Sequence, residues 1–254
     1  MIENNEIDVK ENAAEPVSEA ASPTRREVWR MFDRIAQRYD LLNRLLSLRQ
    51  DVAWRNKLAE NLTDVRDQKI LDLATGTADV LLSLFHQTDK ADAAAGIDMS
   101  DRMLRIGREK IQKNGLSHAI ALFPGDAMHI PFRNNSFDAV TIAFGIRNVL
   151  DVNRSLREMY RTLKPGGRVL ILEFSLPANR LIRQLYLFYF RNILPRIGGV
   201  ISGDSYAYRY LNRTVETFPY GEAFCELLRD AGFQNVRTIP LTFGIASIYR
   251  GNKR

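Results

Sequence analysis

The sequence predicts an α/β fold with a mainly parallel sheet, helices on both faces and a helical cap before the sheet. Three observations predict this fold: a glycine turn between a strand and a helix, acids after the next two strands, and alternating strand-like and helical patterns. In the first, the apolar run Ile70–Leu73 stops before Gly76, and a helical pattern follows at once. Small residues in such a loop let the backbone approach a ligand beyond the carboxyl ends of the strands.

Two acids beyond the glycine loop indicate where that ligand binds. Asp98 ends a second short strand, Ala94–Asp98, at the spacing where an acid accepts hydrogen bonds from ribose hydroxyls. Asp126 follows a third strand, 119–123, in a turn where its carboxylate can accept a hydrogen bond from the adenine amine. Either acid taken singly is more commonly a solvated loop carboxylate or a helix cap. Together, at successive strand ends, they favour a nucleoside ligand.

The glycine pattern favours S-adenosylmethionine over a dinucleotide. A dehydrogenase carries G-x-G-x-x-G and aims a helix N-terminus at a pyrophosphate. Here Gly76 is flanked by Ala74 and Ala78, and Asp79 follows. This carboxylate would repel a pyrophosphate but suits a donor with an ammonium and a sulfonium. The order of strand, loop and acids resembles the class I S-adenosylmethionine-dependent methyltransferases, which implies a Rossmann-like fold with a mainly parallel seven-stranded sheet.

Helical patterns precede the first strand. Residues 24–48 carry apolar side chains at helical spacing and begin at a threonine that follows a Ser-Pro pair, so they should form one or two helices. A second short helix is predicted at 52–62. We expect residues 25–65 to form a helical cap or lid on the domain.

Two helices and two strands continue the alternation. Ser100 is predicted to cap a helix that Gly115 closes. Residues 138–144 form an apolar fourth strand. The helix at 152–163 runs into a Lys-Pro-Gly-Gly stop, and a fifth strand follows at 168–174.

Length and composition are those of one globular domain, with 254 residues, 45% of them hydrophobic and 26% charged. The one cysteine, Cys225, lies in an amphipathic pattern and predicts a buried thiol in a reducing compartment. The three histidines lack ligand spacing, so no metal site is expected.

Residues 1–24 are predicted to be a disordered acidic tail, and 25–254 the catalytic domain. The tail holds six acids against one base, and it lacks the features of a signal or transit peptide, which predicts a cytoplasmic protein. The whole chain carries a net charge of +6, so the body without its tail carries about +11. Nucleic acid and an anionic membrane surface are therefore partners to consider.

Three stretches carry a closer resemblance. Tyr39–Asn43, with the serine and tryptophan after it, is similar to the family pattern Y-D-x-M-N-x-x-[apolar]-S-x-x-x-H-x-x-W, although Asp51 replaces the histidine. Arg161–Ser175 is similar to R-V-[apolar]-K-P-G-G ending in E-x-S, and Phe144–Val149 matches a third pattern. Together they resemble the ubiquinone/menaquinone biosynthesis C-methyltransferases from about residue 30 to the C-terminus. Lys-Pro-Gly-Gly is common among methyltransferases, whereas the other two stretches are specific.

The resemblance implies a donor site along the first four strand ends. The family usually has serine where this chain has Ala143, so the side-chain contact there is lost. The candidate donor-binding residues are Asp72, Gly76, Thr77, Asp98, Met99, Asp126, Ala127 and Ala143.

The family's reaction moves a methyl group from the sulfonium to a ring carbon of a reduced polyprenylated quinone. That carbon becomes nucleophilic when the ring hydroxyl, with a pKa near 10, loses its proton, so the site should stabilise the anion or supply a base. We expect Arg147 to hold the anion, Asn148 to orient the same oxygen, and Tyr39 to act from the lid. Each residue also has a purely structural interpretation: Arg147 could form an ion pair with an acid such as Asp151, and Tyr39 could pack in the core.

Residues 181–194 are rich in leucines and aromatics with arginines at intervals. They are too short and too charged to cross a bilayer. The pattern fits an amphipathic helix that rests in a membrane interface or walls a groove for the prenyl tail, and equally a core or dimer helix. A homodimer and a peripheral position on the inner face of the membrane both follow as expectations.

Rival functions remain. A nucleic-acid methyltransferase would explain the basic body, but no N-P-P-Y-like segment follows the fourth strand, so no nucleic acid is expected. A methyltransferase of a small soluble acceptor would need no prenyl chain. A non-catalytic donor-binding assembly protein is the third reading, and Ala74 and Ala78 in the loop favour it. Neither the ring of the quinol nor its chain length follows from the sequence.

Overall fold

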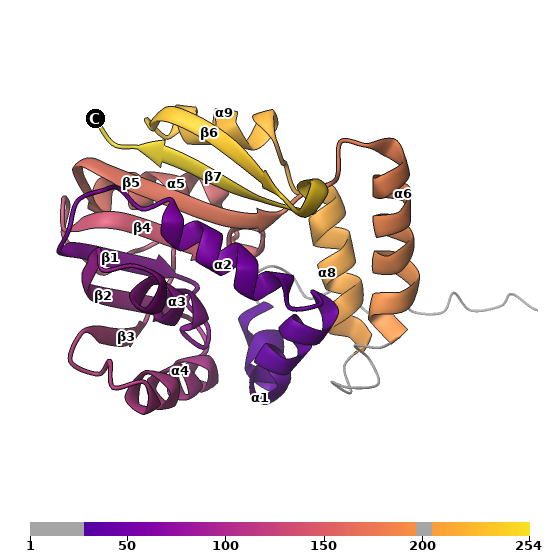
Figure 1. Cartoon of the computed structure of the whole chain (residues 1–254), viewed down its shortest axis with the longest axis horizontal. Helices are drawn as coiled ribbons and strands as arrows, with labels where there is room; N and C mark the ends of the chain where they lie inside the picture. The colour runs from indigo at the N-terminus through magenta and orange to yellow at the C-terminus, as the bar shows by residue number, and fades with distance from the viewer. Residues whose placement is uncertain (1–27, 197–204) are drawn as a thin grey trace, which may run out of the picture.

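The computed structural model describes residues 28–196 and 205–254, so the predicted acidic tail lies outside the described residues. Its centre is a seven-stranded sheet in the order β3-β2-β1-β4-β5-β7-β6, which confirms the predicted fold class (Figure 1). The strands are β1 (Gln68–Leu73), β2 (Ala91–Asp98), β3 (Ile120–Pro124), β4 (Phe137–Ala143), β5 (Leu163–Phe174), β6 (Gln234–Leu241) and β7 (Ala246–Asn252).

The sheet is parallel from β3 through β5, and β7 runs antiparallel between β5 and β6. At the centre, Leu71 of β1 pairs with Ala95 of β2 on one side and Val140 of β4 on the other. The strand order reverses beside β1, and in open α/β sheets ligands bind outside the carboxyl ends of the strands at such a point.

Helices cover both faces of the sheet because successive strand residues point to opposite sides. On one face Leu71 packs in a cluster with α5 (Val152–Thr162) and α9 (Glu222–Asp230). On the other face its neighbour Ile70 packs with α2 (Gln50–Glu60), α3 (Asp79–Gln87) and α4 (Asp101–Lys113). Each fully buried leucine contributes about 2 kcal/mol to these two cores.

Local signals place the helix starts. Ser100 accepts a hydrogen bond from the backbone N–H of Met103, so the predicted cap of α4 is confirmed. Asp151 caps α5 in the same way by accepting from the backbone N–H of Arg154 at 2.9 Å.

Two predicted boundaries differ. The fifth strand begins at Leu163 rather than 168, because Leu163 already pairs with Phe137 of β4, whereas the Lys-Pro-Gly-Gly segment bulges out before pairing resumes at Arg168. A Cβ at Gly167 would lie 3.0 Å from the backbone oxygen of Asp138, so glycine permits this close approach to β4. The segment 181–194 is not one regular helix: α6 (Arg180–Phe188) continues into a π-helical turn, η2 (Tyr189–Ile193).

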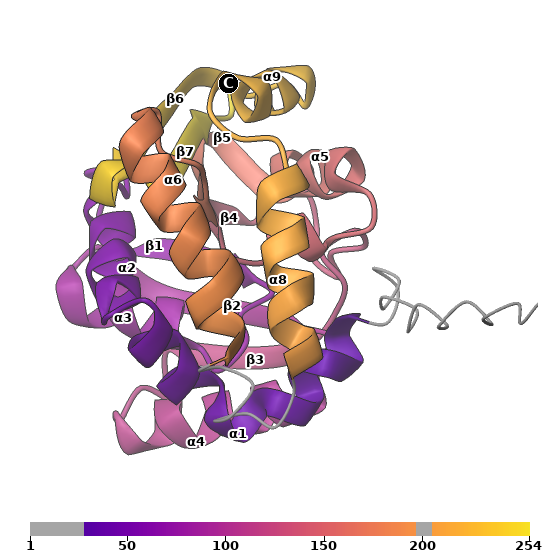
Figure 2. The ribbon, with the colours of Figure 1, turned by 90° about the vertical axis from the view of Figure 1, so that its right-hand side faces the viewer.

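Three helices stand beyond the carboxyl ends of the strands, and a fourth, α2, leads from them onto a face of the sheet. The segment predicted as the cap forms α1 (Val28–Leu46) and α2, and α1 lies against α4. Helices α6 and α8 (Ser205–Thr217) stand side by side at the same end of the molecule (Figure 2). Among the helices in the described ranges, none is long and apolar enough to cross a membrane.

Candidate active site

Two adjoining cavities open beyond the strand ends. The strand-end cavity, of about 290 Å³, is bounded by the loops after β1 to β4 and by α1. The helix-walled cavity, of about 400 Å³, is bounded by α1, α2, α6, η2 and α8. Phe32, Tyr39 and Phe144 line both cavities, so the two spaces meet at these three side chains.

The loop after β1 follows an unusual backbone path. Ala74, Gly76 and Ala78 all have positive φ angles, of 48°, 55° and 65°. Left-handed conformations cost an L-residue about 1–2 kcal/mol, and such strain often marks a ligand site. Gly145, from the loop after β4, packs so close that a Cβ there would lie 2.7 Å from Cβ of Ala74. The two loops therefore form one continuous wall of the strand-end cavity.

Asp98 is the polar anchor of that cavity. One carboxylate oxygen accepts the N–H of Gly76 at 2.9 Å, and the other accepts the N–H of Ser100 at 2.8 Å. Burial raises the pKa of Asp98, and these two backbone N–H groups oppose that rise. The carboxylate is thereby held in one orientation at the carboxyl end of β2.

Apolar side chains line the same cavity as Asp98, among them Met99, Met103 and Ala127. Asp126 lines it too, and its carboxylate accepts the N–H of Met128 at 2.8 Å. Aliphatic and thioether side chains around one acceptor suit a flat heterocycle with an amine.

Six of the eight predicted donor-binding residues line the strand-end cavity: Gly76, Asp98, Met99, Asp126, Ala127 and Ala143. The other two do not. Asp72 is buried inside β1, where it accepts a hydrogen bond from Thr141 Oγ1 at 2.6 Å, and burial raises its pKa to about 7. Thr77 turns toward the lid, and its hydroxyl donates to Asp40 Oδ1 at 2.6 Å.

Two aspartates hold α1 against the strand-end cavity. Asp40 accepts from Lys110 Nζ at 2.9 Å as well as from Thr77, and Lys110 also pairs with Asp79. Two turns earlier, Asp33 accepts from Ser100 Oγ at 2.7 Å. Neither contact follows from the sequence, although Asp40 belongs to the specific tyrosine stretch.

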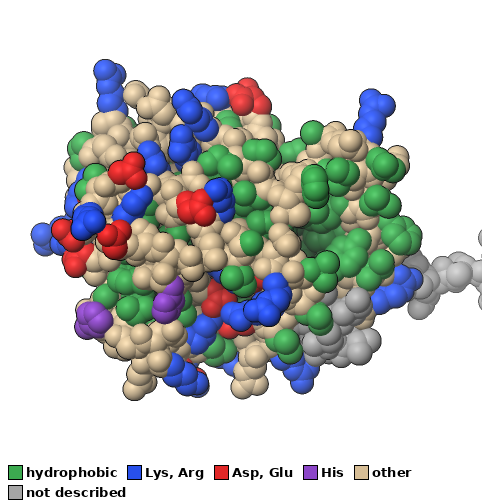
Figure 3. Space-filling view, viewed as in Figure 1, with side chains coloured by type: hydrophobic (Ala, Val, Ile, Leu, Met, Phe, Trp, Pro, Cys, Tyr) green, Lys and Arg blue, Asp and Glu red, His purple; other side chains and the backbone are tan. Residues whose placement is uncertain are grey.

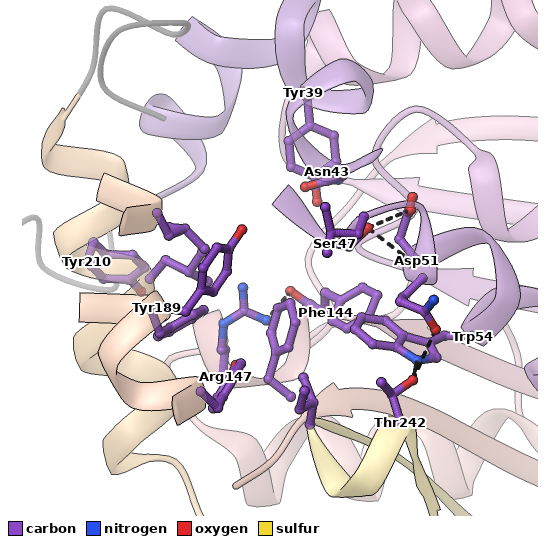
Figure 4. A pocket seen from close by; sticks show the side chains of 18 of the residues that line it. Tyr39, Asn43, Ser47, Asp51, Trp54, Phe144, Arg147, Tyr189, Tyr210 and Thr242 are labelled. Atoms are coloured by element: carbon purple, nitrogen blue, oxygen red, sulfur yellow. Dashed lines mark hydrogen bonds between the residues drawn. The ribbon is translucent and has the colours of Figure 1, made fainter. Parts of the chain in front are cut away.

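The helix-walled cavity is mainly apolar. Trp54, Phe144 and Phe174 pack together on one side, with ring centroids 4.6–6.1 Å apart. Tyr186 and Phe190 come from the segment predicted to handle a prenyl tail. Figure 4 shows aromatic rings on both sides of the space, with the Ser47–Asp51 pair at one edge and Arg147 between the rings.

Arg147 is buried and reaches the helix-walled cavity. One of its nitrogens, Nη1, donates to Glu173 Oε1 at 2.6 Å and to the carbonyl of Phe144 at 2.8 Å. Figure 4 shows its guanidinium beside Tyr189. The predicted structural ion pair of Arg147 does form, but its acid is Glu173 and not Asp151, which caps α5. Strand β5 lies beside β4, so Glu173, near the end of β5, lies against the loop that follows β4.

The pair of Arg147 and Glu173 is incompletely satisfied. Burial raises the pKa of Glu173, and the charge of Arg147 opposes that rise. Within the described part of the chain, Arg147 Nε and Glu173 Oε2 are buried without a hydrogen-bond partner.

The three predicted catalytic residues lie around the boundary between the cavities. Arg147 lines the helix-walled side, Asn148 lines the strand-end side, and Tyr39 lines both. Asn148 Oδ1 accepts from the hydroxyl of Tyr210 at 3.2 Å, which fixes its amide. Burial raises the pKa of Tyr39, while a hydrogen bond with Asn43 and the charge of Arg147 oppose that rise.

Comparison with known proteins identifies the family. The sequence model of the ubiE/COQ5 methyltransferase family matches residues 20–253. The ubiquinone/menaquinone biosynthesis C-methyltransferase UbiE of Geotalea daltonii is 44% identical, over 89% of this chain and 96% of its own. The demethylmenaquinone methyltransferases of Thermus thermophilus and Bacteroides fragilis are 45% and 41% identical, over 88% and 89% of this chain and 100% and 92% of their own.

Solved structures agree on the fold alone. A methyltransferase of Thermotoga maritima, described as a possible histamine N-methyltransferase, superposes with a TM-score of 0.63 at 20% identity, over 89% of this chain and 100% of its own. The [4+2]-cyclase SpnF superposes with a TM-score of 0.60 at 18% identity, over 91% of this chain and 97% of its own. Since one fold serves such different chemistry, function has to be argued from the site.

Proposed function

The chain belongs to the ubiE/COQ5 methyltransferase family, and on that premise we propose that it methylates a ring carbon of a reduced polyprenyl quinone precursor. S-adenosylmethionine supplies the methyl group, activated on its sulfonium. The names of the relatives point to demethylmenaquinol and the corresponding ubiquinone precursor as acceptors.

The observation that carries the proposal is the contact between two cavities of opposite character. The strand-end cavity presents fixed carboxylates, and the helix-walled cavity presents aromatic and aliphatic side chains. A methyl transfer needs donor and acceptor in contact and shielded from water, which two spaces meeting at Phe32, Tyr39 and Phe144 would provide.

The residues of the strand-end cavity fit the donor. Asp98, oriented by two backbone N–H groups, would hold the ribose hydroxyls. Asp126 and the apolar space beside Met99 would hold the adenine. The strained loop around Gly76 would approach the amino-acid end of the donor. Asp79, expected from the sequence to face that end, instead pairs with Lys110 and Arg55 and is not among the residues that line the cavity.

The helix-walled cavity favours an acceptor with an apolar tail over a small soluble one. Its lining comes from five helical segments and consists mainly of aromatic and aliphatic side chains. A polar metabolite would leave most of this lining without a partner, whereas an isoprenoid chain would bury it.

Arg147 is the residue we assign to activating the acceptor. A phenolic hydroxyl with a pKa near 10 is ionised in only about one molecule in a thousand at neutral pH. A guanidinium within the cavity stabilises the ring oxygen as an anion, and Glu173 holds that guanidinium in place. Asn148, fixed by Tyr210, would orient the same oxygen.

The test is methyl transfer from labelled S-adenosylmethionine to reduced demethylmenaquinol and, separately, to a reduced benzoquinol precursor. Replacing Arg147 with alanine should lower kcat about 10²–10³-fold, because a buried charge opposite the developing anion is removed. Donor affinity, measured by calorimetry with S-adenosylhomocysteine, should stay within about twofold of the wild type.

Arg157→Ala is the matched control, since Arg157 is exposed on α5 and lines neither cavity. No product from either quinol, despite tight donor binding, would refute the proposed acceptor and favour a small acceptor or a non-catalytic role. Absence of donor binding would refute the enzyme assignment altogether.

A further inference from the structure

We propose that the mouth of the helix-walled cavity is a membrane-docking surface that seats the protein on an anionic lipid bilayer. The docking surface is an apolar rim made of Leu41, Leu45 and Leu48 near the end of α1, and Leu181, Leu185 and Phe188 on α6. All six side chains are exposed. We choose a bilayer as the partner of this surface because the proposed acceptor carries a polyprenyl tail, which partitions into a bilayer; this choice rests on the proposed function.

The rim is ordered along two helices. On α6 the three side chains are spaced by four and three residues, which places them on one face of the helix. The same spacing links Leu41, Leu45 and Leu48 across the end of α1. Figure 3 shows hydrophobic side chains gathered over α6 and around a hollow beside it.

Two members of the rim mark the mouth of the cavity. Leu48 and Leu185 line the helix-walled cavity, yet they are 77% and 62% exposed. Leu48 is held outward by a turn in which both it and Arg49 have positive φ angles, of 52° and 64°. Phe243, which is 78% exposed, follows the cavity residue Thr242 in the chain. An apolar chain leaving the cavity therefore passes over exposed apolar side chains.

The two segments that form the rim carry charge of one sign. Residues 41–50 and 180–193 contain five arginines and no acidic residue. Two of these, Arg44 and Arg191, pair with acids of neighbouring elements. Arg49 and Arg180 have no ionic partner among the described residues and are exposed. Exposed apolar side chains interspersed with arginine are the pattern of an interfacial segment on anionic lipid.

A second copy of the chain suits this surface less well. A two-fold interface would place the arginines of one rim against those of the other, and like charges repel. It would also cover Leu48 and Leu185, which mark the mouth of the cavity. A bilayer leaves that mouth facing the phase in which the acceptor's tail dissolves.

The experiment is co-sedimentation of the full chain with vesicles of phosphatidylcholine alone or of equimolar phosphatidylcholine and phosphatidylglycerol, without donor or acceptor. We expect binding to the anionic vesicles, weakened by added salt. Leu181→Asp and Phe188→Asp should each weaken it about tenfold, since each replaces an inserted side chain with a charge of the lipid's sign. The matched control is Val65→Asp: Val65 is 61% exposed and Leu181 64%, and Val65 lies before β1, away from the rim.

The proposal would be overturned if the wild type did not bind vesicles, or if all variants bound them equally. It would also be overturned if sedimentation velocity showed a dimer that Leu181→Asp abolishes and the wild type did not bind vesicles. In the activity arm, Leu181→Asp should slow methylation of a long-chain quinol in vesicles and leave that of a short-chain quinol in solution unchanged. If vesicle binding holds but no quinol is methylated, the docking surface stands and the proposed function fails.

Discussion

The strand-end cavity and the helix-walled cavity share a wall, yet they are built in opposite ways. The first takes its shape from backbone: strand ends, turns with positive φ, and carboxylates held by N–H groups, as at Asp98. The second takes its shape from side chains on helices that come together from across the chain. Recognition by placed hydrogen bonds and recognition by apolar volume therefore meet within one active site, and four substitutions can test that division.

The largest effect is expected from Asp72, buried beneath the strand-end cavity. Its pKa of about 7 in the folded protein lies above the usual 3.8, so the folded state binds the proton more tightly than the unfolded state. Stability should fall as pH rises from about 4 through about 7, by at most about 4 kcal/mol in all. Asp72→Asn keeps an acceptor for Thr141 and should be more stable than the wild type at about pH 8, with the gap closing near pH 4.

Urea denaturation at several pH values measures this gap. Asp138→Asn, at the other end of the sheet and paired with Lys164, is the control and should show no such gain at high pH. A stability difference that is independent of pH would mean that Asp72 is ionised as an ordinary acid.

The second effect concerns donor affinity. Asp98→Asn puts an amide where two backbone N–H groups need acceptors and removes the charge that ribose hydroxyls would bond. Hydrogen bonds to a charged group contribute about 1.5–3 kcal/mol, so donor affinity should fall roughly 10- to 100-fold with little change in the KM of the quinol. Asp92→Asn, exposed on the same strand, is the control. Equal loss of donor and quinol affinity would break the division between the cavities.

The third substitution fills the helix-walled cavity. Ile182→Trp adds volume to its α6 wall and should raise the KM of a long-chain quinol about tenfold, with donor affinity unchanged. Leu187→Trp, on the same helix but outside the lining, should have no such effect. A fall in donor affinity upon Ile182→Trp would show that the cavities do not act separately.

The smallest effect tests the wall that joins them. Lys110→Met removes the cation between Asp40 of α1 and Asp79 of α3, at a partly exposed site. Partly exposed ion pairs contribute about 1 kcal/mol or less to stability. Because this pair holds α1 against the strand-end cavity, its loss should lower donor affinity only about threefold. Lys113→Met, exposed on the same helix, controls for loss of charge. Calorimetry with S-adenosylhomocysteine measures both.

The same division explains what the sequence could predict. Gly76, Asp98 and Asp126 each end a strand in a short contiguous pattern, and parallel strands bring such ends together without further information. The pairing of Arg147 with Glu173 depends instead on which strand lies beside β4, and the nearer acid in sequence proved to be a helix cap.

Positions that depend on the lid were harder still to predict. Thr77 sits in the donor loop, but its hydroxyl bonds Asp40 because α1 covers that loop. The helix-walled cavity draws on residues from Met31 to Ile245, so no local pattern could outline it. The sequence of residues 181–194 indicated an apolar helix that could wall a groove, but not the π-helical turn at Tyr189–Ile193.

The wall that α1 forms has a consequence for turnover. Phe32 and Tyr39 face both cavities from one helix, which is fastened at Asp33 and Asp40 on the strand-end side. A displacement of α1 wide enough to release a spent donor would also open the acceptor chamber. Release of the spent donor by this route would therefore also admit water to the helix-walled cavity, so methyl transfer would have to be complete before α1 moves.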